Sequence, residues 1–332
     1  MLLALALSSV CFFFVGHAQQ PSGNASFPAL FAFGDSILDT GNNNFLLSAS
    51  KCNFFPYGRN FPGGIPTGRF GNGRVFSDII TDGLGIKTLL PAFRDPNLSN
   101  DELPTGVCFA SGGSGFDRTT YGFQNVIGVP DQVNDFQNYV GRLNNAVGSE
   151  EANAIISNAV FLISSGNNDI AISFPQRGLL YGGIGGYSDQ LVTWTNDFIK
   201  SLYNMGARKF AVMGTLPLGC LPAQAAFLRS CSVPVNLLAD TFNQKLSANL
   251  DNLGTTFPGA KFAYVDMYSS LLGVINNPLA SGFIDTTDGC VLMPIPCLDA
   301  NTFVFWDYAH PTEKSYLTIA PPLVEELKEK LA

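Results

Sequence analysis

Short apolar segments recur along the chain, and longer segments with a helical period lie between them. Four apolar segments have the length of buried strands: 29–33, 159–164, 210–213 and 262–265. Apolar residues at i, i+3 and i+4 spacing predict helices at 188–205, 235–253 and 312–331. Continuously apolar strands that alternate with amphipathic helices are typical of an open parallel sheet covered on both faces. The pattern therefore predicts an α/β fold.

Two Gly- and Pro-rich stretches, 57–74 and 91–104, interrupt this alternation. We expect both to be long surface loops, which are often binding elements when they are ordered. Residues in and before the first stretch either anchor the loop and core or line a site for an acyl chain: Phe54, Phe55, Pro56, Tyr57, Phe61 and Phe70. No internal repeat or linker divides the chain, so we expect one domain over residues 27–332.

Residues 1–18 are expected to be a secretory signal peptide that is cleaved after Ala18. Its apolar stretch, 2–15, is too short to span a bilayer, and no later stretch reaches the roughly 20 apolar residues of a membrane helix. We therefore expect a secreted protein without a membrane anchor, outside the cell or in the cell wall. Asn24 and Asn97 each begin an Asn-x-Ser acceptor for N-glycosylation, which agrees with export.

Cysteine usage also agrees with export. Of seven cysteines, Cys11 leaves with the signal peptide, and an even number in an oxidising compartment favours disulfides. Proximity in the sequence favours two pairs and leaves a third: Cys220 with Cys231, Cys290 with Cys297, and Cys52 with Cys108. The alternative for Cys108 is a buried free thiol in an apolar stretch. A zinc site is disfavoured, because no Cys-x-x-Cys pair is present and only one histidine follows the signal peptide.

The charge pattern narrows the choice of partners. The formal net charge is −8, and the 18 Lys and Arg residues are scattered singly instead of forming a stripe. Nucleic acids and anionic membrane surfaces are therefore not expected to bind. Nothing in the sequence specifies an oligomer, and we expect a monomer.

Two segments contain residues suited to nucleophilic catalysis. Ser36 follows the apolar strand at 29–33, where a ligand crevice and the amides of a following helix are expected. Asp307 lies three residues before His310, and this spacing lets a carboxylate orient the imidazole that activates a serine. Gly-Asp-Ser also occurs in ordinary turns, and an Asp-His pair also caps helices. However, any histidine-dependent mechanism must use His310.

Two further segments could donate hydrogen bonds to an oxyanion. Asn168 follows the strand at 159–164, and the Gly-rich turn at 109–115 exposes backbone amides. Either segment alone is more often a plain turn. A phosphate-binding loop is not indicated, because the Gly-rich turn lacks both a Gly-Lys-Ser/Thr ending and a Gly-x-Gly-x-x-Gly pattern.

Taken in order, these segments resemble the four signature blocks of the GDSL esterase/lipases, within the SGNH hydrolase superfamily. The blocks read FAFGDS at 31–36, VCFASGG at 107–113, GNND at 166–169 and WDYAHP at 306–311. LPLGCLP at 216–222 resembles a segment of the plant branch. The resemblance covers essentially the whole chain after the signal peptide, and it implies a flavodoxin-like α/β/α sandwich with a five-stranded parallel sheet.

The resemblance also implies roles for individual residues. Ser36 would be the nucleophile, with Asp307 and His310 completing the triad. The oxyanion hole would consist of the Ser36 and Gly113 backbone amides and the Asn168 side chain. No metal or organic cofactor is implied, and the partner is a small-molecule or lipid acyl ester.

The sequence departs from the family pattern at two positions and leaves two alternatives open. Ile37 replaces the usual Leu, and Cys108 replaces an Asn that helps to shape the block around the oxyanion glycine. A disulfide from Cys108 could supply the rigidity instead. The same acyl-enzyme would also serve an acyltransferase, and an inactive secreted binding protein would keep the fold. The sequence does not specify the substrate ester.

Overall fold

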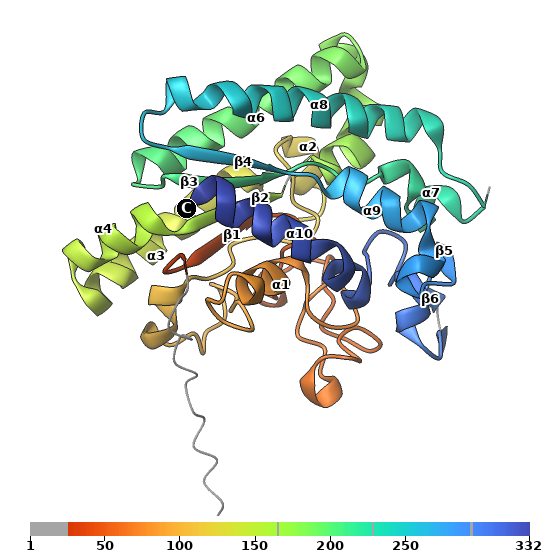
Figure 1. Cartoon of the computed structure of the whole chain (residues 1–332), viewed down its shortest axis with the longest axis horizontal. Coiled ribbons are helices and arrows are strands. Elements are labelled where there is room, and N and C mark those ends of the chain that lie inside the picture. The colour runs from red at the N-terminus through yellow and green to blue at the C-terminus, as the bar shows by residue number, and fades with distance from the viewer. Residues whose placement is uncertain (1–25, 165, 228, 293–294) are drawn as a thin grey trace, which may run out of the picture.

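The fold is built on a parallel sheet in the order β1–β2–β3–β4 (Figure 1). It is seen in a computed structural model that describes residues 26–164, 166–227, 229–292 and 295–332. The strands are β1 (Leu30–Gly34), β2 (Val160–Ser164), β3 (Lys209–Met213) and β4 (Lys261–Val265). All four predicted strands are confirmed to within one residue at each end. Each is paired in parallel with its neighbour, as continuously apolar segments predict.

The free edge of β1 is covered by the segment 107–111. Phe109 N–H donates to Ala32 O at 2.7 Å, and Ser111 N–H donates to Gly34 O at 2.9 Å. Only an isolated parallel bridge between Ala32 and Cys108 forms there, because the chain turns away at the glycines that follow Ser111. The α/β/α sandwich with a parallel sheet is therefore confirmed. Of the five expected strands, four are regular in the described part of the chain, and the irregular segment 107–111 lies in the position of the fifth.

Helices cover both faces of the sheet (Figure 1). On one face α6 (Ile184–Asn204) contacts α3 (Gln132–Val147) and α8 (Val233–Thr256), and on the other α1 (Phe76–Gly83) contacts α10 (Glu313–Leu331). The predicted helices correspond to α6, α8 and α10. The remaining α-helices are α2 (Arg118–Gly122), α4 (Ser149–Asn158), α5 (Phe174–Arg177), α7 (Pro222–Ala225) and α9 (Met267–Asn276). The short strands are β5 (Asp285–Gly289), β6 (Val291–Leu292), β7 (Ile295–Pro296) and β8 (Phe303–Phe305).

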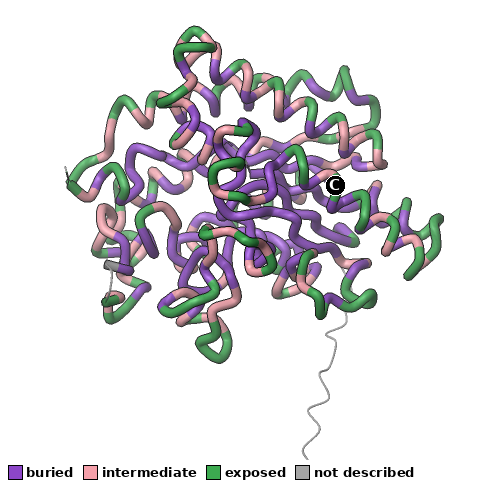
Figure 2. The backbone as a smooth tube through the Cα atoms, turned by 180° about the vertical axis from the view of Figure 1, so that it is seen from behind, coloured by how far each residue is buried: buried purple, intermediate pink, exposed green. Residues whose placement is uncertain are grey.

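Aromatic side chains from β1 form the centre of the core. Phe31 and Phe33 alternate along the strand and so point to the same face, where both contact Phe136 of α3. Phe33 also contacts Phe198 of α6 with ring centroids 5.5 Å apart. These rings are buried, and Figure 2 shows that the central strands are buried along their length. The end of β1 is therefore held rigidly by the packing beneath it.

Two of the three predicted disulfides are present, Cys220–Cys231 and Cys290–Cys297. The third prediction is wrong, because Cys52 and Cys108 are both buried free thiols. The Cys108 thiol donates to Leu38 O at 3.1 Å, while Cys52 lies against the Tyr57 hydroxyl. The buried free thiol that was the alternative for Cys108 is therefore the arrangement observed.

The structure describes only some of the residues on which the prediction of export depends. Asn97 is exposed on the loop before the segment 107–111. Asn24 and the signal peptide at 1–18 lie outside the described residues. Within the described part of the chain, no helix combines the length and the apolar character needed to cross a membrane.

A buried ion pair anchors the loop at 57–74 to α1. The Arg69 guanidinium donates to Asp78 through Nε at 2.7 Å and Nη2 at 2.8 Å. The same carboxylate accepts from Val75 N–H and Leu90 N–H. Breaking such a pair leaves an uncompensated charge out of water.

We predict that Asp78→Asn lowers the free energy of unfolding by about 3–5 kcal/mol, because Arg69 stays buried without a charge partner. Urea unfolding followed by circular dichroism measures the change. Glu325→Gln is the matched control: it removes the exposed ion pair with Lys328 and is expected to change stability by no more than about 0.5 kcal/mol. Equal effects of the two substitutions would show that the buried pair does not anchor the loop.

Candidate active site

Ser36 lies two residues beyond the carboxyl end of β1. The chain passes from β1 to the segment at its free edge and later to β2 on its other side, so the strand order reverses at β1. Ligands bind at such switch points in open α/β sheets. Gly34 brings the strand end close to β2: it has φ +128°, and a Cβ there would lie 1.7 Å from Ser164 O.

The segment after Ser36 is a turn and not the expected helix. Leu38 N–H and Asp39 N–H both donate to Asp35 O. The Asp39 carboxylate accepts from Gly41 N–H and Asn42 N–H, both at 2.8 Å. The expectation of helix amides behind Ser36 is therefore wrong, because these local carboxylate bonds close turns in place of a helix.

Asp307 and His310 lie on a tight turn that follows β8. Trp306 N–H donates to His310 O at 2.7 Å, and Phe305 forms an antiparallel bridge with Pro311. Asp307 Oδ1 accepts from the backbone amides of Ala309 and His310 at 2.8 and 2.9 Å. The turn therefore fixes the carboxylate with its own backbone before any side chain contributes.

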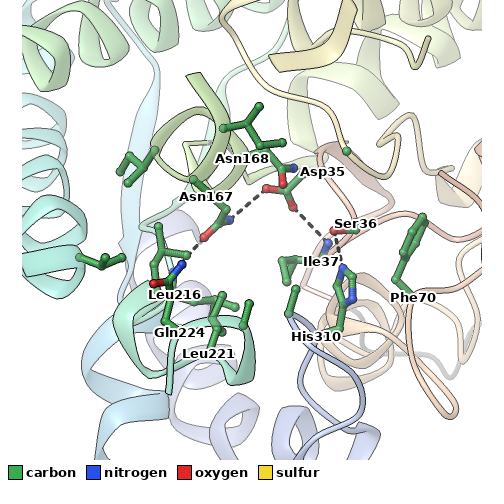
Figure 3. Close-up of a pocket in the computed structure, with 18 of the residues that line it drawn as sticks. Asp35, Ser36, Ile37, Phe70, Asn167, Asn168, Leu216, Leu221, Gln224 and His310 are labelled. Carbon is green, nitrogen blue, oxygen red and sulfur yellow. Dashed lines mark hydrogen bonds between the residues drawn. The ribbon is translucent and has the colours of Figure 1, made fainter. Parts of the chain in front are cut away.

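The structure brings the three predicted triad residues together, and Figure 3 shows the contact between Ser36 and His310. His310 Nε2 lies 2.7 Å from Ser36 Oγ, and His310 Nδ1 lies 2.8 Å from each Asp307 carboxylate oxygen. A carboxylate beside Nδ1 favours the tautomer in which Nδ1 carries the proton, which leaves Nε2 free to accept one from Ser36. These contacts join residues that are 274 positions apart in the sequence.

Burial and charge act in opposite directions on this pair. Burial alone would raise the pKa of Asp307, but the charge and hydrogen bonds of His310 and the local amides hold this pKa below its ordinary value. Burial alone would lower the pKa of His310, whose side chain is only 14% exposed, but Asp307 raises it above the ordinary value. Each residue therefore stabilises the charged form of the other.

Two backbone amides near Ser36 Oγ are unpaired. Among the described residues, neither Ser36 N–H nor Gly113 N–H donates to a backbone carbonyl, and both residues line one cavity. Gly113 has φ +82°, and a Cβ there would lie 2.5 Å from the Gln124 side chain. A glycine is therefore required where the turn exposes its amide.

Asn168 and its neighbour Asn167 follow β2 at the same edge of the sheet. The Asn168 side chain lines the cavity and donates to Ser114 O at 2.8 Å. Asn167 donates to Asp35 at 3.0 Å and accepts from Leu216 N–H at 3.0 Å (Figure 3). The ends of β1, β2 and β3 are thus tied together beneath the site.

Side chains just after Ser36 hold the Gly-rich turn. Gly112 N–H donates to Asp39 at 2.8 Å, and Asn43 donates to Gly112 O at 2.8 Å. Asn42 donates to the backbone carbonyls of Cys108 and Ala110 at 2.9 and 2.8 Å. These three side chains therefore hold the block that a Cys108 disulfide could have made rigid.

The cavity at Ser36 has a volume of about 320 Å³, and its lining combines polar and apolar side chains. Ser36, Gly113, Asn168 and His310 contribute polar groups. Six aliphatic side chains of the lining, which we name the apolar arm, are Ile170, Leu216, Leu218, Leu221, Val235 and Leu238. Among the described residues that line the cavity, Asp35 and His310 are the only charged or titratable side chains. The site therefore suits a polar reacting group attached to an uncharged chain.

The aromatic residues of the loop were predicted either to anchor the loop and core or to line a site for an acyl chain. Few of them line the cavity. Phe70 lines the cavity, with its ring centroid 5.2 Å from that of His310. Phe54 and Phe55 are exposed, Pro56 and Tyr57 do not line the cavity, and Phe61 lies against the Arg69 guanidinium. Of the six residues, Phe70 alone therefore lines the cavity, while Tyr57 anchors the loop through its bond to Asp307.

Several residues of the site were not predicted from the sequence. Tyr57 donates to Asp307 at 2.8 Å, and Asp39, Asn42 and Asn43 hold the Gly-rich turn. The run of small polar residues after Ser36 was the available signal, because turn residues that end up buried must be hydrogen-bonded. In the described ranges, no group of His, Cys, Asp and Glu is arranged to hold a metal ion.

Comparisons with known proteins agree with this geometry. The family model described as GDSL-like Lipase/Acylhydrolase matches residues 30–323. GDSL esterase/lipase At1g73610 of Arabidopsis thaliana is 65% identical over 99% of this chain and 98% of its own length. GDSL esterase/lipase At1g23500 is 64% identical over the same shares, and GDSL esterase/lipase EXL4 is 50% identical over 93% of this chain and 94% of its own, both from Arabidopsis thaliana.

These matches extend over nearly the whole chain and include the segments that form the site. A carboxylic ester hydrolase is the activity that the curated names and the family description share. The chain therefore belongs to the GDSL-like lipase/acylhydrolase family of ester hydrolases.

Proposed function

We propose that the protein hydrolyses acyl esters through an acyl-enzyme formed on Ser36. Asp307 and His310 complete the triad in this proposal. The observation that carries it is the unbroken line of contacts from Asp307 through His310 to Ser36 Oγ, at 2.8 and 2.7 Å. A serine hydroxyl is a weak nucleophile, and an imidazole at this distance can accept its proton.

In the first half of the reaction, Ser36 Oγ bonds to the acyl carbon as its proton passes to His310 Nε2. The carbonyl electron pair moves to the oxygen, and the tetrahedral intermediate then expels the alcohol, which takes the proton from His310. In the second half, His310 deprotonates a water that attacks the acyl-enzyme. The acid leaves, and the proton returns to Ser36 Oγ.

The oxyanion would be stabilised by three donors: Ser36 N–H, Gly113 N–H and the Asn168 side chain. The unpaired amides and the shared cavity support this assignment. Loss of one such donor typically lowers the rate by about 10²- to 10³-fold. Asn168 would have to exchange its bond with Ser114 O for one with the oxyanion, or share its two amide protons between them.

The apolar arm supports an acyl chain as the non-reacting part of the substrate. None of the six described side chains of the arm is cationic, so none could pair with an anionic acyl group. Secretion is part of the proposal: two disulfides and the absence of a spanning helix among the described residues are consistent with it. The signal peptide, the glycosylation at Asn24 and Asn97 and the single domain stay predictions.

We predict that Ser36→Ala abolishes hydrolysis of a short p-nitrophenyl ester, because the acyl-enzyme has no other hydroxyl in its place. Release of p-nitrophenol measures turnover, and a fluorophosphonate probe measures covalent labelling of the folded protein. Ser157→Ala, which removes a half-buried hydroxyl on α4 that does not line the cavity, is the control and is expected to keep full activity. Full turnover or labelling in Ser36→Ala would refute the assignment.

A second prediction concerns pH. Activity requires neutral His310, so it falls as pH decreases through a His310 pKa that Asp307 holds above its ordinary value. In Asp307→Asn only burial acts strongly on the imidazole, and this lowers its pKa. We therefore expect the acid limb of kcat/KM to move to lower pH, with kcat reduced by about 10⁴-fold.

The measurement is kcat/KM for the p-nitrophenyl ester across the pH range. Asp299→Asn removes an exposed carboxylate and should leave the profile unchanged. An acid limb in Asp307→Asn that stays in place, or moves to higher pH, would contradict the coupling of the two residues.

The apolar arm predicts selectivity for acyl-chain length. Each methylene buried in the arm contributes about 0.8 kcal/mol, or roughly a fourfold gain in kcat/KM, until the arm is full. Leu238→Trp fills the arm, so the gain with chain length should disappear while acetate esters still react. Leu237→Trp is the matched control, because Leu237 is 60% exposed and does not line the cavity. An unchanged chain-length profile in Leu238→Trp would show that the acyl chain lies elsewhere.

A further inference from the structure

The two oxygens of the Asp307 carboxylate have different donors. Oδ1 accepts from the amides of Ala309 and His310, which belong to its own turn. Oδ2 accepts from the Tyr57 hydroxyl at 2.8 Å. His310 Nδ1 lies at equal distance from both oxygens, so among the described residues Tyr57 is the one other side chain bonded to the carboxylate.

Tyr57 reaches Asp307 from the loop at 57–74, which is 250 positions away in the sequence. Its ring lies edge-on to Trp306, the residue before Asp307, with centroids 6.2 Å apart. Arg59 donates to Cys297 O at 2.6 Å and to Leu298 O at 3.0 Å, and its guanidinium lies over the Trp306 ring. The loop is thus fastened to the segment that carries Asp307, and the phenol is held in place.

Cys52 lies beside the Tyr57 hydroxyl. Burial, reinforced by the negative charge of Asp307, raises the pKa of both groups, so both stay protonated over the working range. Tyr57 therefore keeps the proton that it donates to Asp307 Oδ2 at 2.8 Å.

We propose that Tyr57 is a positioning residue for the ester hydrolysis proposed above, holding the Asp307 carboxylate in the orientation in which it aligns His310 with Ser36. Tyr57 does not line the cavity and so acts through Asp307, not through the substrate. Hydrogen bonds to charged groups are the stronger class, and the loss of one leaves a buried oxygen partly unpaired. The role rests on the proposed function of Ser36, Asp307 and His310.

Removal of the phenol hydroxyl also changes the electrostatic interaction between Asp307 and His310. Without this donor, more of the carboxylate charge acts on His310, and the imidazolium is stabilised further. The other titratable groups that face the pair are Asp35 after β1, Tyr316 of α10 and Cys52, and Tyr57→Phe leaves all three in place. The acid limb of activity should therefore move to higher pH, opposite to the effect of Asp307→Asn.

The test is Tyr57→Phe, assayed with a short p-nitrophenyl ester. We expect kcat to fall by about 10- to 100-fold with KM unchanged within twofold, and the acid limb to move to higher pH. Tyr139→Phe is the matched control: it removes a buried hydroxyl that donates to Leu103 O away from the cavity. It should keep both kcat and the pH profile. Tyr57→Phe that is folded by circular dichroism and retains wild-type kcat would overturn the proposal.

A double-mutant cycle with Asp307→Asn separates positioning from general structural support. If Tyr57 acts through the carboxylate, Tyr57→Phe changes the residual rate of Asp307→Asn by less than twofold. An equal fold-loss in both backgrounds would overturn the proposal in favour of a purely structural role. Ser36→Ala assayed alongside keeps the two hypotheses distinct: activity retained there refutes the nucleophile, whereas a failure confined to Tyr57→Phe refutes only the positioning role.

Discussion

A carboxylate buried beside a histidine sets the strictest requirement in this structure. Asp307 is 7% exposed, and its charge is stable there only because amides, a phenol and an imidazole surround it. The tight turn at 306–311 supplies two of these donors, and a loop from the other end of the chain supplies the phenol. The bonds that satisfy this one buried charge therefore also align His310 with Ser36.

Buried carboxylates that need hydrogen-bond donors also hold the Gly-rich turn on the opposite wall of the site. Asp39 accepts from Gly112 N–H, and Asp169 accepts from Phe116 N–H and Asp117 N–H, so two buried carboxylates hold both ends of the turn that contains Gly113. Burial raises the pKa of each to about 6. Since the unfolded chain would release these protons at lower pH, the contribution of each group to stability falls as pH rises towards 6. Burial of the two carboxylates therefore lowers the stability of the fold at neutral pH, while their hydrogen bonds keep the turn rigid.

What the sequence predicted well was regular and local. The buried strands 29–33, 159–164, 210–213 and 262–265 show in the pattern because strands covered on both faces must be apolar throughout. The signature blocks identified Ser36, Asp307 and His310, which the structure brings together. Contacts between distant loops leave no such periodicity, so the bond from Tyr57 to Asp307 was missed. Counting cysteines also failed for Cys52 and Cys108, because an even number does not show which thiols lie close enough to pair.

Cys108 shows how the wall tolerates an unusual residue. Its thiol bonds to Leu38 O, whereas its backbone carbonyl is held by the Asn42 side chain. The anchoring of this block therefore depends on the residues after Ser36 and little on the side chain at 108. Because Asp39, Asn42 and Asn43 all follow Ser36 closely in the chain, Ser36 and the Gly113 amide belong to a single hydrogen-bonded unit. In the proposed reaction, this unit would hold the nucleophile and the oxyanion donor at the fixed separation that acyl transfer requires.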